Sequence, residues 1–485
     1  MTLLKEKLRE LEIASRLLEP AAPARQAARD RVIEYSEEFL DNIDHLKAFQ
    51  VTTDSGAGLY RAPIAEIGID LAQVLELLRE NVDKPGLNPA SGGHLGYIPG
   101  GGIYYSALGD YVADVFNHYA GIFFAGPGAV RMENMLLRWM SDLAGYPASA
   151  GGNLTSGGSL ANLIAIVTAR DAKGIKASAI ERSVIYLSQQ AHHSIEKAIR
   201  IAGLGECIVR HLPLDEKYRI IPEQLAHAII EDQVKGLNPF LIVASAGTTD
   251  VGAIDPLSEI GVIAENTGAW FHIDAAYGGF FLLTDEGRAK LAGIERSDSL
   301  VIDPHKGLFL PYGLGVVLVK DAVKLGKSHY YQANYMQDAL ASDDQTSPAD
   351  LSPELTKHFR GLRLWLPLML HGVAPFRACL EEKLLLAKYF YAEVQTLGFQ
   401  SEIEPELSVV VYRYAPENSD ADAFNKALLD AVVADGRIFI SSTILSGKFT
   451  LRFACLSFRT HLETVDTLLQ ILKENVARLL DQVVS

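Results

Sequence analysis

Short apolar runs that alternate with segments of helical length constrain the fold of this chain more than any other feature. Between about residues 140 and 325, runs of about five to seven apolar or β-branched residues recur. Such runs, joined by helices, predict a buried and mainly parallel sheet with right-handed crossovers. Ligands bind beyond the carboxyl ends of strands in these sheets, so we expect the chemistry there. The runs are 183–188, 207–212, 240–246, 270–274, 299–303 and 315–320.

The two flanks of this region predict further parts of the molecule. The first 85 residues or so resemble helices with charged faces, beginning with an amphipathic helix that has Leu4, Leu8 and Leu11 on one stripe. After a helical stretch at 354–396, strand-like runs and helices alternate up to a final helix. We expect an N-terminal helical arm at 1–90, a large α/β domain at 91–375 and a small C-terminal α+β domain at 376–485.

Composition excludes several classes of protein. The chain has 44 Lys and Arg against 60 Asp and Glu, a net charge of −16, so binding to nucleic acid or to an anionic membrane surface is not expected. No apolar stretch is long enough to span a membrane, and the N-terminus does not resemble a secretory signal. The three cysteines form neither a metal-ligand pattern nor a disulfide framework, which indicates the cytoplasm.

Two predicted strands end in residues that carry charge. Asp274 closes the apolar run WFHID, where a buried carboxylate needs a cation or several hydrogen-bond donors; it could equally cap the next segment. Lys306 follows the run SLVID in an apolar setting, where lost hydration would lower the pKa of its amine and make it a better nucleophile. The ordinary alternative is a lysine that extends to the surface.

Three other strand ends carry polar or small residues. The run LTSGGSLAN at 154–162 precedes an apolar helix, and free N–H groups at a helix start bind anions, although a tight turn would use the same residues. SAGTTD at 245–250 offers hydroxyl groups, and His192 and His193 offer flat imidazole rings. A phosphate site, a carboxylate, a flat ring and a dehydrated amine at one sheet edge together match the three chemical handles of pyridoxal phosphate.

The chain also resembles a known family, the group II pyridoxal-phosphate amino-acid decarboxylases, which include aromatic-L-amino-acid and glutamate decarboxylases. The resemblance covers nearly the whole chain. Its most specific segments are QQAHHSIEKA (189–198), HIDAAYGG (272–279) and DPHK (303–306), followed by HFRGLRLW (358–365) and KFTLRFACLSFRT (448–460). It implies a type I pyridoxal-phosphate transferase-like α/β fold, built as a homodimer with its sites at the subunit interface.

The resemblance also implies roles for individual residues. Lys306 would bind the cofactor aldehyde covalently, Asp274 would pair with the pyridine nitrogen, and His192 would stack on the ring. Tyr335 would return the proton to the substrate Cα, with Tyr330 and Tyr331 as competitors. Ala276 would pack on the opposite face of the ring, Gly157, Gly158, Ser159 and Asp303 would surround the phosphate, Thr249 would contact the cofactor, and His305 would lie on the substrate side.

These roles imply decarboxylation of an L-amino acid to the amine and CO₂. Tyr97, Ile98 and Pro99 form the presumed substrate segment, which is apolar and aromatic and therefore favours an aromatic substrate. Asp303 departs from the asparagine of several family members, and a carboxylate would repel the phosphate unless it faces away or is neutral. Three alternatives stay open: an acidic or diamino substrate, a carbon–carbon lyase or aldehyde-forming oxidase, and a non-catalytic dimeric interaction protein.

Overall fold

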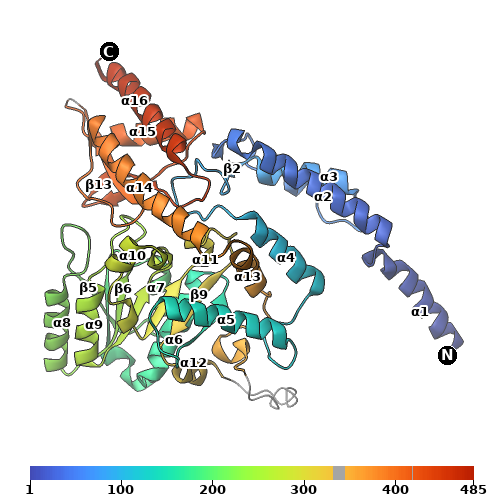
Figure 1. Ribbon diagram of the computed structural model, residues 1–485, viewed down its shortest axis with the longest axis horizontal. Coiled ribbons are helices and arrows are strands. Elements are labelled where there is room, and N and C mark those ends of the chain that lie inside the picture. Colours follow the sequence, from blue (N-terminus) through green and yellow to red (C-terminus); the bar gives the residue numbers. More distant parts are fainter. Residues whose placement is uncertain (331–344, 418, 485) are drawn as a thin grey trace.

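A seven-stranded sheet forms the centre of the computed structural model, which describes residues 1–330, 345–417 and 419–484 (Figure 1). The strand order is β3-β9-β8-β7-β6-β4-β5; the five strands from β8 to β5 are parallel, and β9 is antiparallel to both β8 and β3. The mainly parallel α/β sheet is therefore confirmed. The strands are β3 Gly151–Thr155, β4 Ser183–Ser188, β5 Ile208–Leu212, β6 Asn238–Ser245, β7 Trp270–Asp274, β8 Ser299–Ile302 and β9 Gly315–Val319.

Alternate residues of each central strand enter two separate apolar layers, as a sheet covered on both faces requires. In β4, Val184 and Tyr186 join one layer, while Ile185 and Leu187 join the other. The first layer packs against α5 (Pro127–Leu143), α8 (Pro222–Val234) and α9 (Leu257–Thr267). The second packs against α6 (Gly158–Ala172), α7 (His193–Ile201) and α12 (Ala322–His329).

A second, antiparallel sheet forms the small C-terminal part, with the order β10-β11-β13-β12. Its apolar face packs on three helices whose buried residues form one cluster. The elements are α14 Ala374–Thr396, β10 Phe399–Gln400, β11 Val409–Tyr414, α15 Ala421–Asp435, β12 Ser441–Leu445, β13 Lys448–Ala454 and α16 Leu462–Val484. The domain boundaries expected near residues 90 and 375 stay predictions.

The N-terminal helices extend away from the rest of the molecule (Figure 1). They are α1 (Thr2–Ser15), α2 (Ala22–Asn42) and α3 (Leu71–Leu78), and α1 and α2 contain no buried residue. Leu4, Leu8 and Leu11 of α1 are all exposed. Among the described helices, none is both long and apolar enough to cross a membrane.

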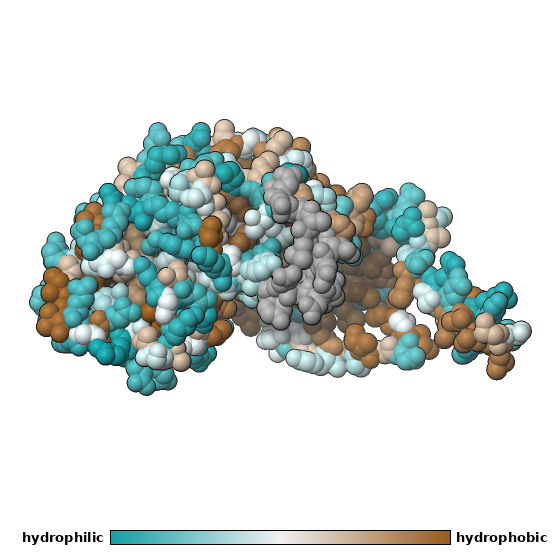
Figure 2. Space-filling view, turned by 90° about the horizontal axis from the view of Figure 1, so that it is seen from below, coloured by the Kyte–Doolittle hydropathy of each residue, from teal (hydrophilic) through white to brown (hydrophobic). Residues whose placement is uncertain are grey.

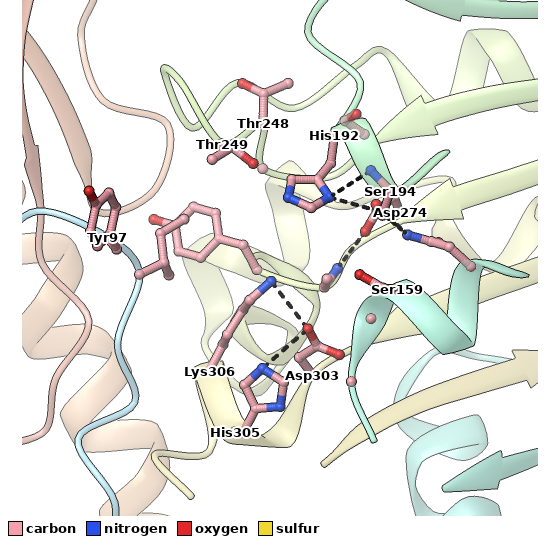
Figure 3. Close-up of a pocket in the computed structure, with 18 of the residues that line it drawn as sticks. Tyr97, Ser159, His192, Ser194, Thr248, Thr249, Asp274, Asp303, His305 and Lys306 are labelled. Atoms are coloured by element: carbon pink, nitrogen blue, oxygen red, sulfur yellow. Dashed lines mark hydrogen bonds and ion pairs between the residues drawn. The ribbon is translucent and has the colours of Figure 1, made fainter. Parts of the chain in front are cut away.

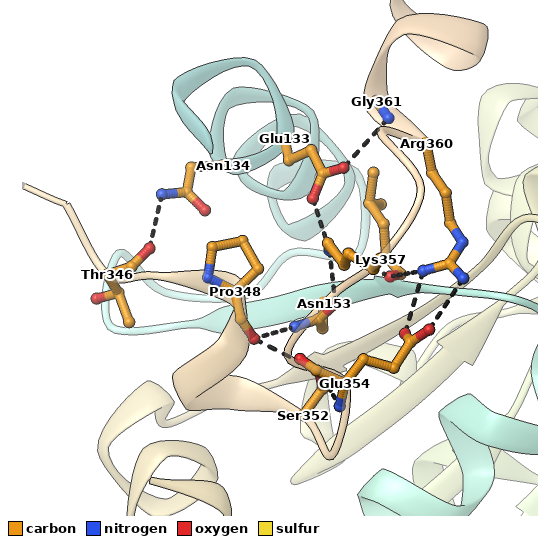
Figure 4. Close-up of polar contacts among 11 residues, drawn as sticks. Glu133, Asn134, Asn153, Thr346, Pro348, Ser352, Glu354, Lys357, Arg360 and Gly361 are labelled. Carbon is orange, nitrogen blue, oxygen red and sulfur yellow. Dashed lines mark hydrogen bonds and ion pairs between the residues drawn. The ribbon is translucent and has the colours of Figure 1, made fainter. Parts of the chain in front are cut away.

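A buried polar cluster holds β3 against the segment that leads into α13 (Gly361–His371), as Figure 4 shows. Lys357 forms an ion pair with Glu133 of α5 at 2.7 Å, and both side chains are completely inaccessible to solvent. Lys357 also donates a hydrogen bond to the Asn153 side chain at 3.1 Å, and Asn153 donates one to the Pro348 carbonyl at 2.7 Å. The cluster therefore fixes the strand that runs directly into the glycines at 157 and 158.

Candidate active site

A cavity of about 420 Å³ lies where β4, β6, β7 and β8 end, at the edge of the sheet that the sequence predicts (Figure 3). Most of the predicted site residues line it. Pro99 is buried but does not line the cavity, and Tyr335 lies outside the described residues. The predicted residues in the lining are Tyr97, Ile98, Gly157, Gly158, Ser159, His192, Thr249, Asp274, Ala276, Asp303, His305 and Lys306.

Lys306 reaches the cavity from α11 (Pro304–Gly307), a single helical turn that Pro304 begins directly after β8. Its Nζ lies 3.1 Å from Oδ2 of Asp303, and the lysine side chain keeps about a quarter of its surface exposed. The amine is therefore neither buried in the core nor extended to the outer surface. It points into the cavity (Figure 3).

Asp303 lies against the start of α6 and does not face away from it. A Cβ on Gly158 would come within 2.9 Å of Oδ2 of Asp303, so only glycine fits there without displacement. Asp303 Oδ1 is buried without a hydrogen-bond partner, and His305 Nε2 lies 3.6 Å from Oδ2. Burial lowers the pKa of His305, although the carboxylate opposes this shift.

Asp274 ends β7 as a nearly buried carboxylate that two donors satisfy. Its Oδ2 accepts a hydrogen bond from Asn162 Nδ2 at 2.9 Å, and its Oδ1 accepts one from the Ala276 backbone N–H at 3.1 Å. The alternative interpretation, in which Asp274 caps the next segment, is thus partly realised through Ala276. The carboxylate nevertheless lines the cavity, where a further cationic donor can reach it.

His192 precedes α7 and caps it, because its Nδ1 accepts the Ser194 backbone N–H at 3.3 Å. The Ser194 hydroxyl lies 2.7 Å from the same nitrogen. Desolvation lowers the pKa of His192, and the nearby Asp274 carboxylate opposes that shift. The imidazole is therefore held neutral, with its ring at the cavity wall (Figure 3).

The start of α6 offers free backbone N–H groups to the cavity. No side chain caps this helix, and Gly157, Gly158 and Ser159 line the cavity at its first turn. The uncapped donors and the helix dipole favour an anion there, such as a phosphate group. The close approach of this turn to β9 also requires glycine, since a Cβ on Gly315 would lie 2.5 Å from the Gly157 carbonyl carbon.

The C-terminal part contributes one lining residue that the sequence analysis missed, Arg452 of β13. It donates hydrogen bonds to the backbone carbonyls of Thr249, Asp250 and Gly96 and to the Ser441 hydroxyl. Burial lowers the pKa of this guanidinium. Asn162 and Ser194 were also missed, because they come from helices and no local pattern distinguishes them from ordinary core positions.

Comparisons with known proteins agree with this geometry. Residues 67–415 match the model of the pyridoxal-dependent decarboxylase conserved domain. The chain is 33% identical to an aromatic-L-amino-acid decarboxylase of Bacillus atrophaeus, over 89% of this chain and 91% of that protein. It is 29% identical to tryptophan decarboxylase 2 of Oryza sativa subsp. japonica, over 94% and 95% of the two chains.

Solved structures share the fold. The crystal structure of Oryza sativa TDC with PLP and tryptamine superposes with a TM-score of 0.89 at 24% identity, over 95% of this chain and 99% of that one. The structure of mouse CSAD gives a TM-score of 0.85 at 25% identity, over 94% and 99%. The predicted type I fold is confirmed, the cofactor is pyridoxal phosphate, and the chain belongs to the pyridoxal-dependent decarboxylases.

Proposed function

We propose that this enzyme decarboxylates an aromatic L-amino acid to its amine and CO₂. The observation that carries the proposal is the single cavity in which Lys306, Asp274 and the uncapped start of α6 meet. An amine, a carboxylate and an anion site are the three groups that pyridoxal phosphate needs. The described residues therefore fit the cofactor, with the Asp303 carboxylate as the unusual member of the set.

Different residues would hold different parts of the cofactor. When bound, pyridoxal phosphate supplies an electron sink for the bond between Cα and the carboxylate. Lys306 would be the amine that holds the cofactor aldehyde. Asp274 would hold a proton at the pyridine nitrogen, and its burial would strengthen this interaction. The first turn of α6 would bind the phosphate, while His192 and Ala276 would contact the two faces of the ring.

Tyr335 keeps its proposed role as the donor of a proton to Cα. Tyr330 and Tyr331 are the competing donors, and of the three only Tyr330, next to the end of α12, is among the described residues. A hydroxyl donor at this step favours the amine over an aldehyde product. Replacing Tyr335 with phenylalanine should therefore lower amine formation and raise the aldehyde fraction, which mass spectrometry of the products measures.

The preference for an aromatic substrate rests on the wall of the cavity opposite Asp274. Tyr97 lies there (Figure 3), and Ile98 and Tyr312 also line the cavity. Arg452 is the cation beside them, and its four hydrogen bonds to protein oxygens occupy most of its donors, which disfavours a second substrate carboxylate. The names of the relatives from Bacillus atrophaeus and Oryza sativa point to the same class of substrate.

The test is a panel of separate aromatic, acidic and basic L-amino acids incubated with the cofactor-loaded enzyme. Amine, aldehyde and CO₂ are measured by mass spectrometry, with the Lys306→Ala protein as the inactive control. We expect an aromatic amine and CO₂ in equal amounts. Amine from an acidic or diamino substrate would refute the argument from the cavity wall. Aldehyde would favour the activity of a second relative, a phenylacetaldehyde synthase of Arabidopsis thaliana that is 30% identical over 84% of this chain.

We also propose that the enzyme is a homodimer. The arm and the facing helix α4 (Tyr104–Phe116) expose apolar side chains, among them Val32, Ile33 and Leu108. A groove of about 1000 Å³ lies between α2 and α4, and Figure 2 shows brown side chains where the arm meets the body. Exposed apolar side chains gathered around one groove are typical of a protein–protein interface. Light scattering should give a dimer, and Leu108→Glu should give monomers; a monomeric wild-type enzyme would contradict the proposal.

Two further expectations from the sequence stand as proposals. The division into an arm at 1–90, a large domain at 91–375 and a small domain at 376–485 is supported by the two separate sheets, of seven and four strands. The cytoplasm is supported by three cysteines that form no disulfide. Fractionation of the source cells, followed by detection of the protein, tests the second of these.

A further inference from the structure

Asn162 of α6 joins the two side chains that are expected to hold the cofactor ring. Its Nδ2 donates hydrogen bonds to Oδ2 of Asp274 at 2.9 Å and to the Ser194 hydroxyl at 3.0 Å. That hydroxyl in turn lies 2.7 Å from Nδ1 of His192. Two groups from different elements, a carboxylate at the end of β7 and an imidazole before α7, are therefore connected through one amide.

The same amide is held on its other side by residues of the sheet. Oδ1 of Asn162 lies 3.0 Å from Nε2 of His272, and Nδ1 of His272 lies 2.9 Å from the Ser299 hydroxyl. Trp270 Nε1 donates to that hydroxyl at 2.8 Å. Trp270, His272 and Asp274 alternate along β7, so all three face α6.

The Asp274 carboxylate fixes the direction of these bonds. A carboxylate can only accept, so the NH₂ group of Asn162 faces Asp274 and the amide oxygen accepts from His272 Nε2. His272 Nδ1 then accepts the hydrogen of the Ser299 hydroxyl, whose oxygen accepts from Trp270. Burial lowers the pKa of His272 to about 4, so the ring is neutral and its remaining N–H, at Nε2, donates to Asn162 Oδ1. This contact sets the orientation of the amide and aims its NH₂ group at Asp274 and Ser194.

The same assignment of donors and acceptors extends to the residues of the cavity. Ser194 Oγ accepts from the amide and is left with one hydrogen to donate, which goes to His192 Nδ1. The proton of neutral His192 then resides on Nε2. Three titratable groups act on the pKa of His192 besides Asp274: His193 and Lys306 lower it, and Asp303 raises it.

The position of this network excludes an ordinary packing role. Asn162 and His272 are almost completely buried between α6 and the sheet, within a layer of apolar side chains such as Ile164 and Val301. Polar groups in such a layer cost free energy unless each is paired, and apolar residues of the same size would pack there without that cost. The network ends at the two cavity residues, so its effect is exerted there.

We propose that Asn162 and His272 are positioning residues that orient the Asp274 carboxylate and set the tautomer of His192. The proposal rests on the proposed function, since it assumes that these two side chains contact the cofactor ring. Without Asn162, Asp274 keeps one donor, the Ala276 N–H, so its Oδ2 loses the contact that orients the carboxylate toward the cavity. Ser194 also loses its fixed donor, so His192 would be free to change tautomer.

Two variants test this proposal. Asn162→Ala removes both donated bonds, while Asn162→Asp keeps the shape but replaces the donor amide with an acceptor beside Asp274. Asn425→Ala is the matched control, because Asn425 is equally buried in the C-terminal part and donates two comparable bonds, to the Tyr414 and Ala421 carbonyls. Each protein is titrated with pyridoxal phosphate, and the visible absorption of the loaded protein is followed against pH.

We expect both Asn162 variants to bind the cofactor about tenfold more weakly, as the loss of a hydrogen bond to a charged group implies, and to shift the midpoint of the absorption change. Asn425→Ala should lose thermal stability and keep the wild-type affinity and midpoint. The proposal is overturned if either folded Asn162 variant keeps the wild-type affinity and midpoint, or if Asn425→Ala shifts them equally. A wild-type protein that binds no pyridoxal phosphate would instead overturn the proposed function.

Discussion

Replacement of Lys357 with methionine tests the contribution of the buried ion pair with Glu133 to the stability of the fold. Lys357 and Glu133 pair at 2.7 Å with both side chains fully inaccessible. In the variant, the Glu133 carboxylate stays buried and keeps one donor, the Gly361 backbone N–H at 3.3 Å. An uncompensated buried charge costs about 3–5 kcal/mol, so Lys357→Met should lower the free energy of unfolding by about that amount.

The measurement is urea unfolding followed by circular dichroism, with two comparison proteins. Adding Glu133→Gln removes the charge while an amide oxygen still accepts the Gly361 N–H, so the double variant should regain at least about 2 kcal/mol of the loss. Lys235→Met breaks the exposed pair of Lys235 with Glu231 and should cost about 0–1 kcal/mol. A loss below about 1 kcal/mol for Lys357→Met, or no recovery in the double variant, would refute the reasoning.

The remaining predictions concern the cofactor and the dependence of stability on pH. Asp303→Asn removes a negative charge against the phosphate site and should tighten pyridoxal-phosphate binding about tenfold in a fluorescence titration; weaker binding would mean that the ion pair with Lys306 is needed instead. Burial lowers the pKa of His94 to about 4, so the unfolded chain binds more protons and stability falls as the pH drops from 6.5 through 4. His94→Leu should therefore lose less stability than the wild type between pH 7 and pH 4.5, by up to about 3 kcal/mol, and equal losses in urea unfolding would contradict this. Lys306→Ala should abolish both turnover and the visible absorption of bound cofactor, whereas persistent turnover would show that another group carries the reaction.

Local pattern was enough to predict the parallel core of the fold. Strands β4, β6, β7 and β8 are buried on both faces, and their residues enter two layers, so the runs stand out in the sequence. Strand β3 was missed because its residues, GGNLT, resemble a glycine-rich turn, and only its pairing with β9 makes it a strand. The antiparallel direction of β9 also depends on tertiary structure, since the connection from β8 contains α11 and no crossover helix.

The site residues also fall into two groups, those that the local sequence predicts and those that only tertiary packing brings to the cavity. Asp274 and Lys306 were predictable because each follows an apolar strand and must lie at its carboxyl end. Arg452 reaches the cavity from β13 of the small sheet, so only the packing of two distant parts of the chain brings it there. Pro99 is buried and does not line this cavity, so its expected contact with the substrate stays a prediction. The local sequence does not distinguish Asn162 from other polar residues near a helix start, because its contacts depend on the packing of α6 against β7.

Covalent labelling of Lys306 tests the central claim most directly. The cofactor-loaded enzyme is reduced with borohydride, which makes the bond between an amine and the cofactor aldehyde permanent, and the digested protein is mapped by mass spectrometry. The account predicts a phosphopyridoxyl group on Lys306 in the wild type, and none at that site in an Asp274-intact Lys306→Ala control. A label on another lysine, or no label in an enzyme that still releases CO₂ from an amino acid, would contradict it.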